Sequence, residues 1–441
     1  MQKGAASIET AQELKSFRPV GFAMKSRGKG HLAILWFLLI LAVALAVSTP
    51  AAAQREFIYT ANFADNNISG FSLSPGNGKT TEVPGSPFGA GVGPASITHS
   101  PDGRFVYAVM SSQFLGRPCG INNGKLISYS VNPRNGALTM IDDIVLAGVC
   151  STGVAIDPTG NFVYAASFPP EDLKVGIIDG FQTSNGHLIP LPGTPFASAI
   201  EADPGQSPAI QQMVITPDGR VLYASNPNDS RGILIFDRDS TTGALAFRAG
   251  VETGSGFDPI AITPSGNFLL ALSEVEFATG QPGLFEFAIG TNGDLTPVSG
   301  SPFPLPHDFG NSVGISPDGG FVATVGVFSA ITGTGISAFR ENAQGRLSLV
   351  PGSPFGDATA FDLVFDPDGH FVVIPGAVFR IDRRRGALTP VSEFVPGGLA
   401  QSITVLKVCK AHDKDEDKRH GAGDKREDSV CPEFKLNRHG D

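Results

Sequence analysis

The sequence predicts an all-β protein, a seven-bladed β-propeller of four-stranded antiparallel blades with one blade closed by N- and C-terminal strands. Three observations predict this fold. A pattern recurs about every 50 residues, incomplete copies of it stand at both ends, and the 441 residues include 54 Gly and 34 Pro. So much Gly and Pro, with 41% hydrophobic residues, is typical of short strands joined by tight turns.

The first element of the repeat is a hairpin built on a Pro-x-Gly turn between two apolar stretches. Proline fixes φ at the first turn position, and glycine adopts positive φ two residues later. Each copy therefore predicts two strands joined by a tight turn. Six copies begin at Ile97, Val154, Met213, Ile260, Val313 and Leu363.

The second element is a residue-Gly-x-Leu turn between two further short strands, which is a hairpin signal. Two hairpins make one four-stranded propeller blade. The six turn glycines are Gly136, Gly186, Gly243, Gly293, Gly345 and Gly386.

The seventh blade is divided between the chain ends. Phe57–Ala61, Ile68–Leu73 and a hairpin at Asn77-Gly78 lack an innermost strand, and Gln401–Val408 is a strand without a blade. Joining them closes the ring, which removes the open sheet edges that promote aggregation.

The N-terminal segment predicts export. Residues 24–53 have a basic start, an apolar run from Leu32 to Val47 and a small-residue site after Ala53, as in a secretory signal peptide. Residues 1–23 form an upstream extension, with Met24 the better initiator. The run is shorter than the ~20 residues of a membrane span, so cleavage is favoured over a retained anchor. We expect a secreted or periplasmic propeller over residues 54–408.

The cysteines fit an oxidising compartment, since their number is even. Three connectivities are open, and pairs closing local loops are favoured. Zinc is disfavoured because no C-x-x-C spacing occurs. The favoured pairs are Cys119 with Cys150 and Cys409 with Cys431.

Residues 409–441 form a tail dominated by charges of both signs, which predicts disorder. Its acidic start imitates a calcium loop. However, Lys418 stands where the loop needs Gly, and Asp424 replaces the bidentate Glu.

The charge and motif content exclude several functions. A net charge of −10 argues against nucleic acid, and no nucleotide, haem or zinc-helix motif occurs. We expect no cofactor, no metal and no stable membrane span. The expected partner of this monomer is a small polar ligand or a protein.

The repeats resemble YVTN-type repeats, and the whole set resembles the lactonase-family seven-bladed propellers related to 6-phosphogluconolactonase. The resemblance rests on Ser100–Ala108 and its copies, the Asn-Gly-x-Leu hairpins, and the Pro-Gly-Ser-Pro-Phe segments at Pro84–Phe88 and Pro351–Phe355. It covers Phe57 to Val408. It implies hydrolysis of a sugar lactone by His, Arg and Glu groups near one mouth of the channel.

The residues that lead into the inner strands are polar, but they include no Arg and almost no base. This pattern favours binding of a small polar ligand or protein partner without catalysis. The predicted channel-mouth residues are Ser96, Thr152, Gln211, Gln212, Asp258, Asn311, Asp362 and Gln401.

The alternative is a periplasmic lactonase that hydrolyses a sugar lactone. Its candidate catalytic residues are a histidine in an apolar slot, a possible base–orienter pair, and charges in long loops. They are His99, the pair His307 and Asp308, and Arg117 and Glu274. Convergence of these side chains on one mouth would favour the enzyme.

Overall fold

The computed structural model describes ten segments of the unit Gln54–Asp441. They are residues 55–111, 124–169, 175–201, 210–227, 230–253, 255–256, 259–273, 283–306, 310–326 and 334–408. The predicted signal peptide and charged tail lie outside them. Within these segments, no helix is long and apolar enough to cross a membrane.

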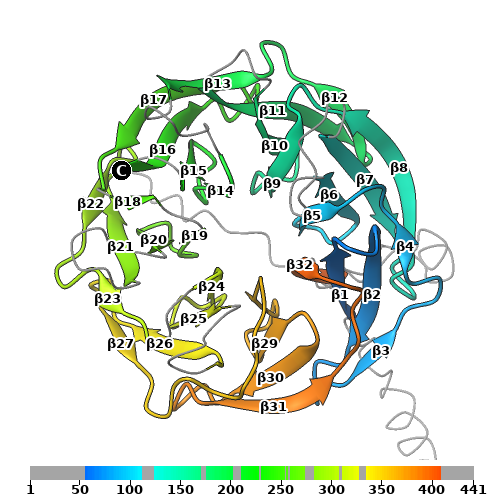
Figure 1. Ribbon diagram of the computed structural model, residues 1–441, viewed down its shortest axis with the longest axis vertical. Helices are drawn as coiled ribbons and strands as arrows, with labels where there is room; N and C mark the ends of the chain where they lie inside the picture. Colours follow the sequence, from blue (N-terminus) through cyan, green and yellow to red (C-terminus); the bar gives the residue numbers. More distant parts are fainter. Residues whose placement is uncertain are drawn as a thin grey trace, which may run out of the picture. The chain divides into compact units, whose positions relative to one another are not determined.

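The described strands form seven sheets arranged in a ring (Figure 1), antiparallel apart from one short parallel pair in the fourth blade. The closing blade contains β32 (Ala400–Val408), β1 (Arg55–Asn62), β2 (Asn67–Leu73), β3 (Thr80–Glu82) and β4 (Phe88–Gly89). Blade 2 contains β5 (Pro94–His99), β6 (Phe105–Met110), β7 (Lys125–Val131) and β8 (Leu138–Val145). Blade 3 contains β9 (Cys150–Ile156), β10 (Phe162–Phe168), β11 (Val175–Ser184), β12 (His187–Pro190) and β13 (Phe196–Glu201).

The remaining four sheets continue in chain order. Blade 4 contains β14 (Met213–Ile215), β15 (Val221–Ser225), β16 (Arg231–Arg238), β17 (Leu245–Val251) and β18 (Ser255–Gly256). Blade 5 contains β19 (Ile260–Ile262), β20 (Phe268–Ser273), β21 (Gly283–Ile289), β22 (Leu295–Pro297) and β23 (Phe303–Pro304). Blade 6 contains β24 (Ser312–Ile315), β25 (Phe321–Val325), β26 (Ser337–Glu341) and β27 (Leu347–Leu349). Blade 7 contains β28 (Val364–Phe365), β29 (Phe371–Ile374), β30 (Ala377–Ile381) and β31 (Leu388–Glu393).

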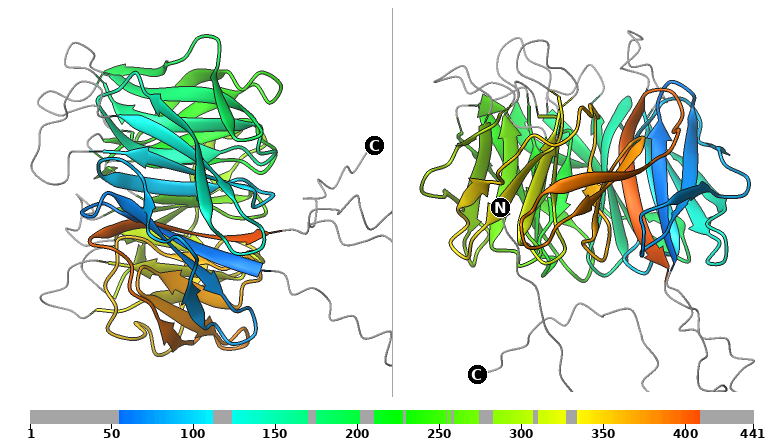
Figure 2. Two further views of the ribbon diagram at one scale, coloured as in Figure 1. Left: turned by 90° about the vertical axis from the view of Figure 1, so that its right-hand side faces the viewer. Right: turned by 90° about the horizontal axis from the view of Figure 1, so that it is seen from below.

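The predicted closure of the ring by both chain ends is confirmed. β32 pairs antiparallel with β1 from Arg55↔Val408 to Asn62↔Ala400, so the last strand is the innermost strand of the first blade. Figure 2 shows the two strands side by side. Unfolding the closing blade must therefore separate the two ends of the propeller.

Four blades carry a short fifth strand that the repeat pattern did not predict. Three of these strands, β4, β13 and β23, begin at the phenylalanine of a Pro/Ser-Gly-Ser/Thr-Pro-Phe segment and pair with the third strand of their blade. In each segment the hydroxyl before the proline accepts a backbone N–H from that third strand, as Ser86 does from Gly70 at 3.1 Å. The segments therefore fold back onto their own blades.

The apolar core consists of seven clusters of described residues, and each spans the seam between two neighbouring blades. At every seam a hairpin glycine of one blade packs against a side chain at or near the start of the second strand of the preceding blade. All seven glycines have positive φ. The contacts are Gly78–Phe371, Gly136–Phe57, Gly186–Phe105, Gly243–Phe162, Gly293–Val221, Gly345–Phe268 and Gly386–Phe321.

Tyrosine hydroxyls add hydrogen bonds at three of these seams. The Tyr59 hydroxyl donates to the Gly136 carbonyl at 2.7 Å, and Tyr164 and Tyr223 donate in the same way to Gly243 and Gly293. The tyrosine belongs to one motif and the glycine to the other. The two motifs of the repeat thus bind each other across the seams.

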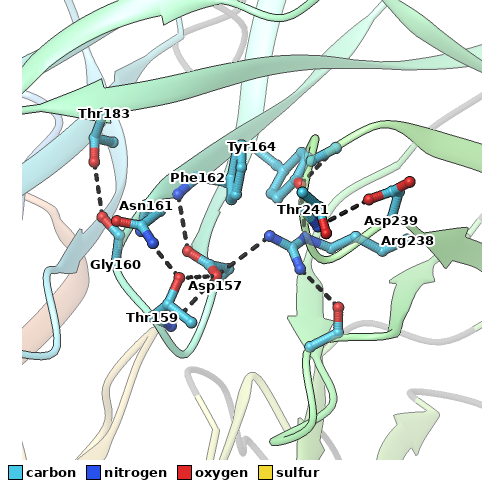
Figure 3. A network of polar contacts seen from close by, with 12 residues as sticks. Asp157, Thr159, Gly160, Asn161, Phe162, Tyr164, Thr183, Arg238, Asp239 and Thr241 are labelled. Carbon is cyan, nitrogen blue, oxygen red and sulfur yellow. Dashed lines mark hydrogen bonds and ion pairs between the residues drawn. The ribbon is translucent and has the colours of Figure 1, made fainter.

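The seam between blades 3 and 4 also contains a buried ion pair (Figure 3). Arg238, at the end of β16, lies 3.2 Å from the carboxylate of Asp157 and donates to the Tyr164 hydroxyl at 2.7 Å. Asp157 also accepts the Phe162 N–H at 2.8 Å. Because both charged groups are partnered, the pair connects two blades without leaving an isolated buried charge.

We predict that Gly78→Ala destabilises the propeller by about 2–4 kcal/mol, because positive φ disfavours Ala and overpacking adds strain. A Cβ at this position would lie 2.7 Å from the Phe371 ring. Gly76→Ala in the same hairpin is the control, since its Cβ would meet nothing within 4 Å. Urea unfolding of both variants measures the difference, and equal midpoints would contradict the role of the seam contact.

Candidate functional site

The starts of the seven inner strands lie together at one end of the ring, which we call the front face. Three of these starts are connected by hydrogen bonds that the Ser312 hydroxyl, the Ser402 hydroxyl and the Ile403 N–H donate to the carboxylate of Asp362. The Pro-x-Gly turns lie at the opposite end, which we call the back face. There, turn glycines contact turn prolines of the neighbouring blade, as Gly160 contacts Pro101.

Seven of the eight predicted channel-mouth residues are described, and all seven are half-buried. They are Ser96, Thr152, Gln211, Gln212, Asn311, Asp362 and Gln401. Asp258 lies outside the described residues, as do Arg117, Glu274, His307 and Asp308. His99 is therefore the one predicted catalytic residue that lies within the described segments.

Asp362 is the most connected of the front-face residues. Its carboxylate accepts the Ser312 hydroxyl at 2.8 Å and the Ser402 hydroxyl at 2.9 Å. It also accepts the backbone N–H groups of Leu363 at 2.8 Å and Ile403 at 2.9 Å. Burial raises its pKa, against the effect of these four donors. The carboxylate therefore joins blade 6, blade 7 and the closing blade.

Two more predicted mouth residues also bond to neighbouring strands. The Thr152 hydroxyl donates to the Ile210 carbonyl at 2.5 Å, across the seam between blades 3 and 4. The Gln212 side-chain oxygen accepts the Ile260 N–H at 2.7 Å, across the next seam. These polar side chains hold inner strands together, which limits their availability to a ligand.

His99 lies in the seam between β5 and β32, at the far end of β5 from Ser96. Three residues of strand separate the two positions by about 10 Å. Its Nδ1 is 2.7 Å from the Thr404 hydroxyl. Burial lowers the pKa of His99 to about 4, with Asp102 opposing the shift, so the imidazole is neutral and weakly basic at neutral pH. This geometry suits a partnered core histidine.

Two buried acids in neighbouring blades were missed by the sequence reasoning. Glu286 on β21 is fully buried, and burial, with a smaller contribution from Glu341, raises its pKa to about 8. Burial alone raises the pKa of Glu341, on β26, to about 7. The sequence signal that could have revealed Glu286 was its position as the single acid inside the apolar strand Gly283–Ile289.

Cys150 begins β9, is fully buried and is disulfide-bonded, as expected for an oxidising compartment. Cys119, Cys409 and Cys431 lie outside the described residues. The predicted pairing therefore stays a prediction.

We predict that Asp362→Ala destabilises the protein by about 3 kcal/mol or more, because buried donors in three blades lose their acceptor. Asp362→Asn should be intermediate, since it keeps one acceptor oxygen. Asp143→Ala is the control, because Asp143 forms an exposed pair with Lys125 that contributes about 0–1 kcal/mol. Chemical denaturation gives the three values, and a loss for Asp362→Ala no larger than the control's would contradict the assignment.

We predict that Glu286→Gln raises the free energy of unfolding at pH 9 but leaves it nearly unchanged at pH 5. The native state keeps a proton on Glu286 up to a pKa of about 8, which the unfolded chain loses near 4.5. This raised pKa stabilises the native state below pH 4.5, and the stabilisation is lost as pH rises to about 8, by at most ~1.4 kcal/mol per pH unit. Glutamine removes that dependence.

Denaturation at several pH values measures the effect of Glu286→Gln, with Glu82→Gln as an exposed control. A difference between variant and wild type that is constant from pH 5 to 9 would rule out the buried proton.

Part of the sequence matches a known family. Residues 57–186 match the model of a family described as Lactonase, 7-bladed beta-propeller. This match covers the closing-blade strands β1 to β4, all of blade 2 and most of blade 3. No curated protein matches the sequence.

Solved structures share the whole propeller. A Bacteroides uniformis protein with a provisional designation as 6-phosphogluconolactonase has 18% identity and a TM-score of 0.65, covering 80% of this chain and all of its own. A periplasmic gluconolactonase of Pseudomonas aeruginosa has 18% identity and a TM-score of 0.62, with 80% and 100% coverage. The resemblance to lactonase-family propellers seen in the repeats is therefore confirmed, and at this identity the structures establish a shared fold.

Proposed function

We propose that this protein is a lactonase that hydrolyses an unphosphorylated lactone of a sugar acid. The match of residues 57–186 to the lactonase family carries the proposal. The similar fold of a gluconolactonase supports the substrate class. In the reaction, water attacks the lactone carbonyl, the ring C–O bond breaks, and the ring oxygen leaves as a hydroxyl after gaining a proton. The enzyme must supply a general base and donors for the oxyanion.

The composition of the front face favours an unphosphorylated substrate. Recognition of a phosphate favours Arg or Lys at the site. The residues that begin the seven inner strands include neither, from Ser96 in blade 2 to Gln401 in the closing blade. The sugar hydroxyls would find amide partners there instead, on Gln211 and Gln401.

The catalytic groups stay a prediction from the sequence. His307 and Asp308 are the proposed base and its orienter, since the His99 imidazole is partnered within a seam and weakly basic. Arg117 and Glu274 are the other candidates. An extracytoplasmic location is part of the proposal, supported by the signal-like segment 24–53 and by the disulfide at Cys150.

Binding without catalysis is the second candidate, and the sequence alone favours it. It is supported by the lack of Arg and Lys among the described residues that begin the inner strands, and by the commitment of the one carboxylate there, Asp362, to neighbouring blades. The family match nevertheless favours hydrolysis.

We predict turnover of glucono-lactone by the purified protein well above spontaneous hydrolysis, with at least a tenfold preference over the 6-phosphorylated lactone. His307→Ala should lower kcat/KM by about 10²-fold or more if His307 is the base. His187→Ala is the control, because His187 is exposed and pairs with Asp142 on an outer strand. Folded protein without turnover would reject the lactonase and leave the binding function. Turnover that survives His307→Ala would reject this base alone.

A further inference from the structure

The back-face turn of blade 7 differs from the corresponding turns of the other repeats. In five turns, the residue before the proline and the residue after it include at least one hydroxyl, and their side chains hydrogen-bond each other. These pairs are Ser100–Asp102, Asp157–Thr159, Thr216–Asp218, Thr263–Ser265 and Ser316–Asp318. In blade 7 both positions are carboxylates, Asp366 and Asp368, so neither can donate to the other when both are ionised.

Only one of the two carboxylate oxygens of Asp366 accepts hydrogen bonds from described residues. One oxygen accepts the backbone N–H groups of His370 at 2.7 Å and Phe371 at 2.5 Å. The other oxygen is buried and has no hydrogen-bond partner among the described residues. Asp157, the matching aspartate of blade 3, has Arg238 beside it. No described Arg or Lys forms an ion pair with Asp366.

A third carboxylate comes from the closing blade. Glu56 on β1 is fully buried, and neither of its oxygens has a hydrogen-bond donor among the described residues. Its side chain reaches Asp368, which is itself an acceptor, and lies near Asp366. Lys407, directly opposite Glu56 on β32, lies 2.6 Å from Asp368 and balances one charge of the three.

His370 completes the group at the surface. Ligand atoms of Asp366, Asp368 and His370 all lie within 4.8 Å of one another, a spacing that fits one ion with ligands at about 2.4 Å. Asp368 is half-buried and His370 is exposed, so an ion can enter from solvent. We call the following four residues the acidic seam cluster: Glu56, Asp366, Asp368 and His370.

We propose that the acidic seam cluster binds a divalent cation, Mn²⁺ or Ca²⁺. Carboxylate oxygens are the preferred ligands of both ions, and one imidazole is compatible with Mn²⁺. The ion takes the place that the turn hydroxyl or Arg238 fills at other seams. Asp366, Asp368 and His370 supply the three ligand atoms, and Glu56 on β1 of the closing blade lies beside them. The ion therefore lies at the seam between blade 7 and the closing blade.

The charge balance supports this proposal. Three carboxylates, Glu56, Asp366 and Asp368, lie together with Lys407 as the one described lysine near them. The cluster therefore needs a positive partner beyond Lys407. A proton on Glu56 is the competing partner, and the experiment separates the two.

The test uses the purified protein after EDTA treatment and dialysis, with Mn²⁺ binding followed by electron paramagnetic resonance and by thermal unfolding. We expect one tight Mn²⁺ and a rise of at least about 2 °C in Tm at saturating Mn²⁺. Glu56→Gln and Asp368→Asn should each weaken that binding at least tenfold. Asp318→Asn is the matched control, since Asp318 holds the position of Asp368 in the blade 6 turn and pairs with Arg383.

Each outcome decides the proposal. Circular dichroism first establishes that the variants are folded, and Glu56→Gln keeps the shape of the side chain. Loss of the tight site in both cluster variants but not in Asp318→Asn supports the cation. The absence of bound Mn²⁺ and of a Tm shift with 1 mM Mn²⁺ or Ca²⁺ overturns it in favour of the proton. Equal binding by wild type and either cluster variant also overturns it, and equal binding by both variants assigns the ion to another part of the chain, such as the acidic segment from Asp413.

Discussion

The contact between a hairpin glycine and a side chain at or near the start of the second strand of the preceding blade is the constraint on which the ring depends. It recurs at all seven seams, and in six of them the partner of the glycine is a phenylalanine ring within 2.8 Å of where a Cβ would lie. Glycine is needed at this position for two reasons: the backbone has positive φ, and a Cβ would occupy the space of the neighbouring side chain. The two turn motifs recur together because each blade supplies one half of this contact to each neighbour.

A ring held by pairwise seams has one seam that depends on the two ends of the chain. Here β1 and β32 form an antiparallel ladder with one register shift between Ala61 and Asn62, and carboxylates of blade 7 connect to it at both faces. On the front face Asp362 accepts hydrogen bonds from Ser402 and Ile403, and on the back face Asp368 pairs with Lys407. Closure is thus secured by polar contacts in addition to apolar packing, at the seam where unfolding can begin.

The fold was predictable because its signals are local. A Pro-x-Gly turn, a residue-Gly turn and the apolar stretches between them each lie within a few residues, and their repetition gave the blade number and the closure. The site was less predictable because its contacts join distant residues. Asp362 was expected at the mouth, but its donors Ser312 and Ser402 come from other strands. Glu56 stands at the start of the first strand, and nothing near it in the sequence indicates Asp366 and Asp368.

Side chains at the inner strands bind neighbouring strands, whereas the candidate reacting groups lie in the connections, and this difference bears on the proposed chemistry. The inner strands use Thr152, Gln212 and Asp362 to bind one another, so a hydrolytic site has few uncommitted groups on the strands themselves. Reacting groups would then come from the connections, where Arg117, Glu274 and His307 stand between described strands. Loops on a rigid scaffold can change without altering the fold, so a shared fold does not by itself define the reaction. The seam contacts therefore account for the fold, and the loop side chains must decide the reaction.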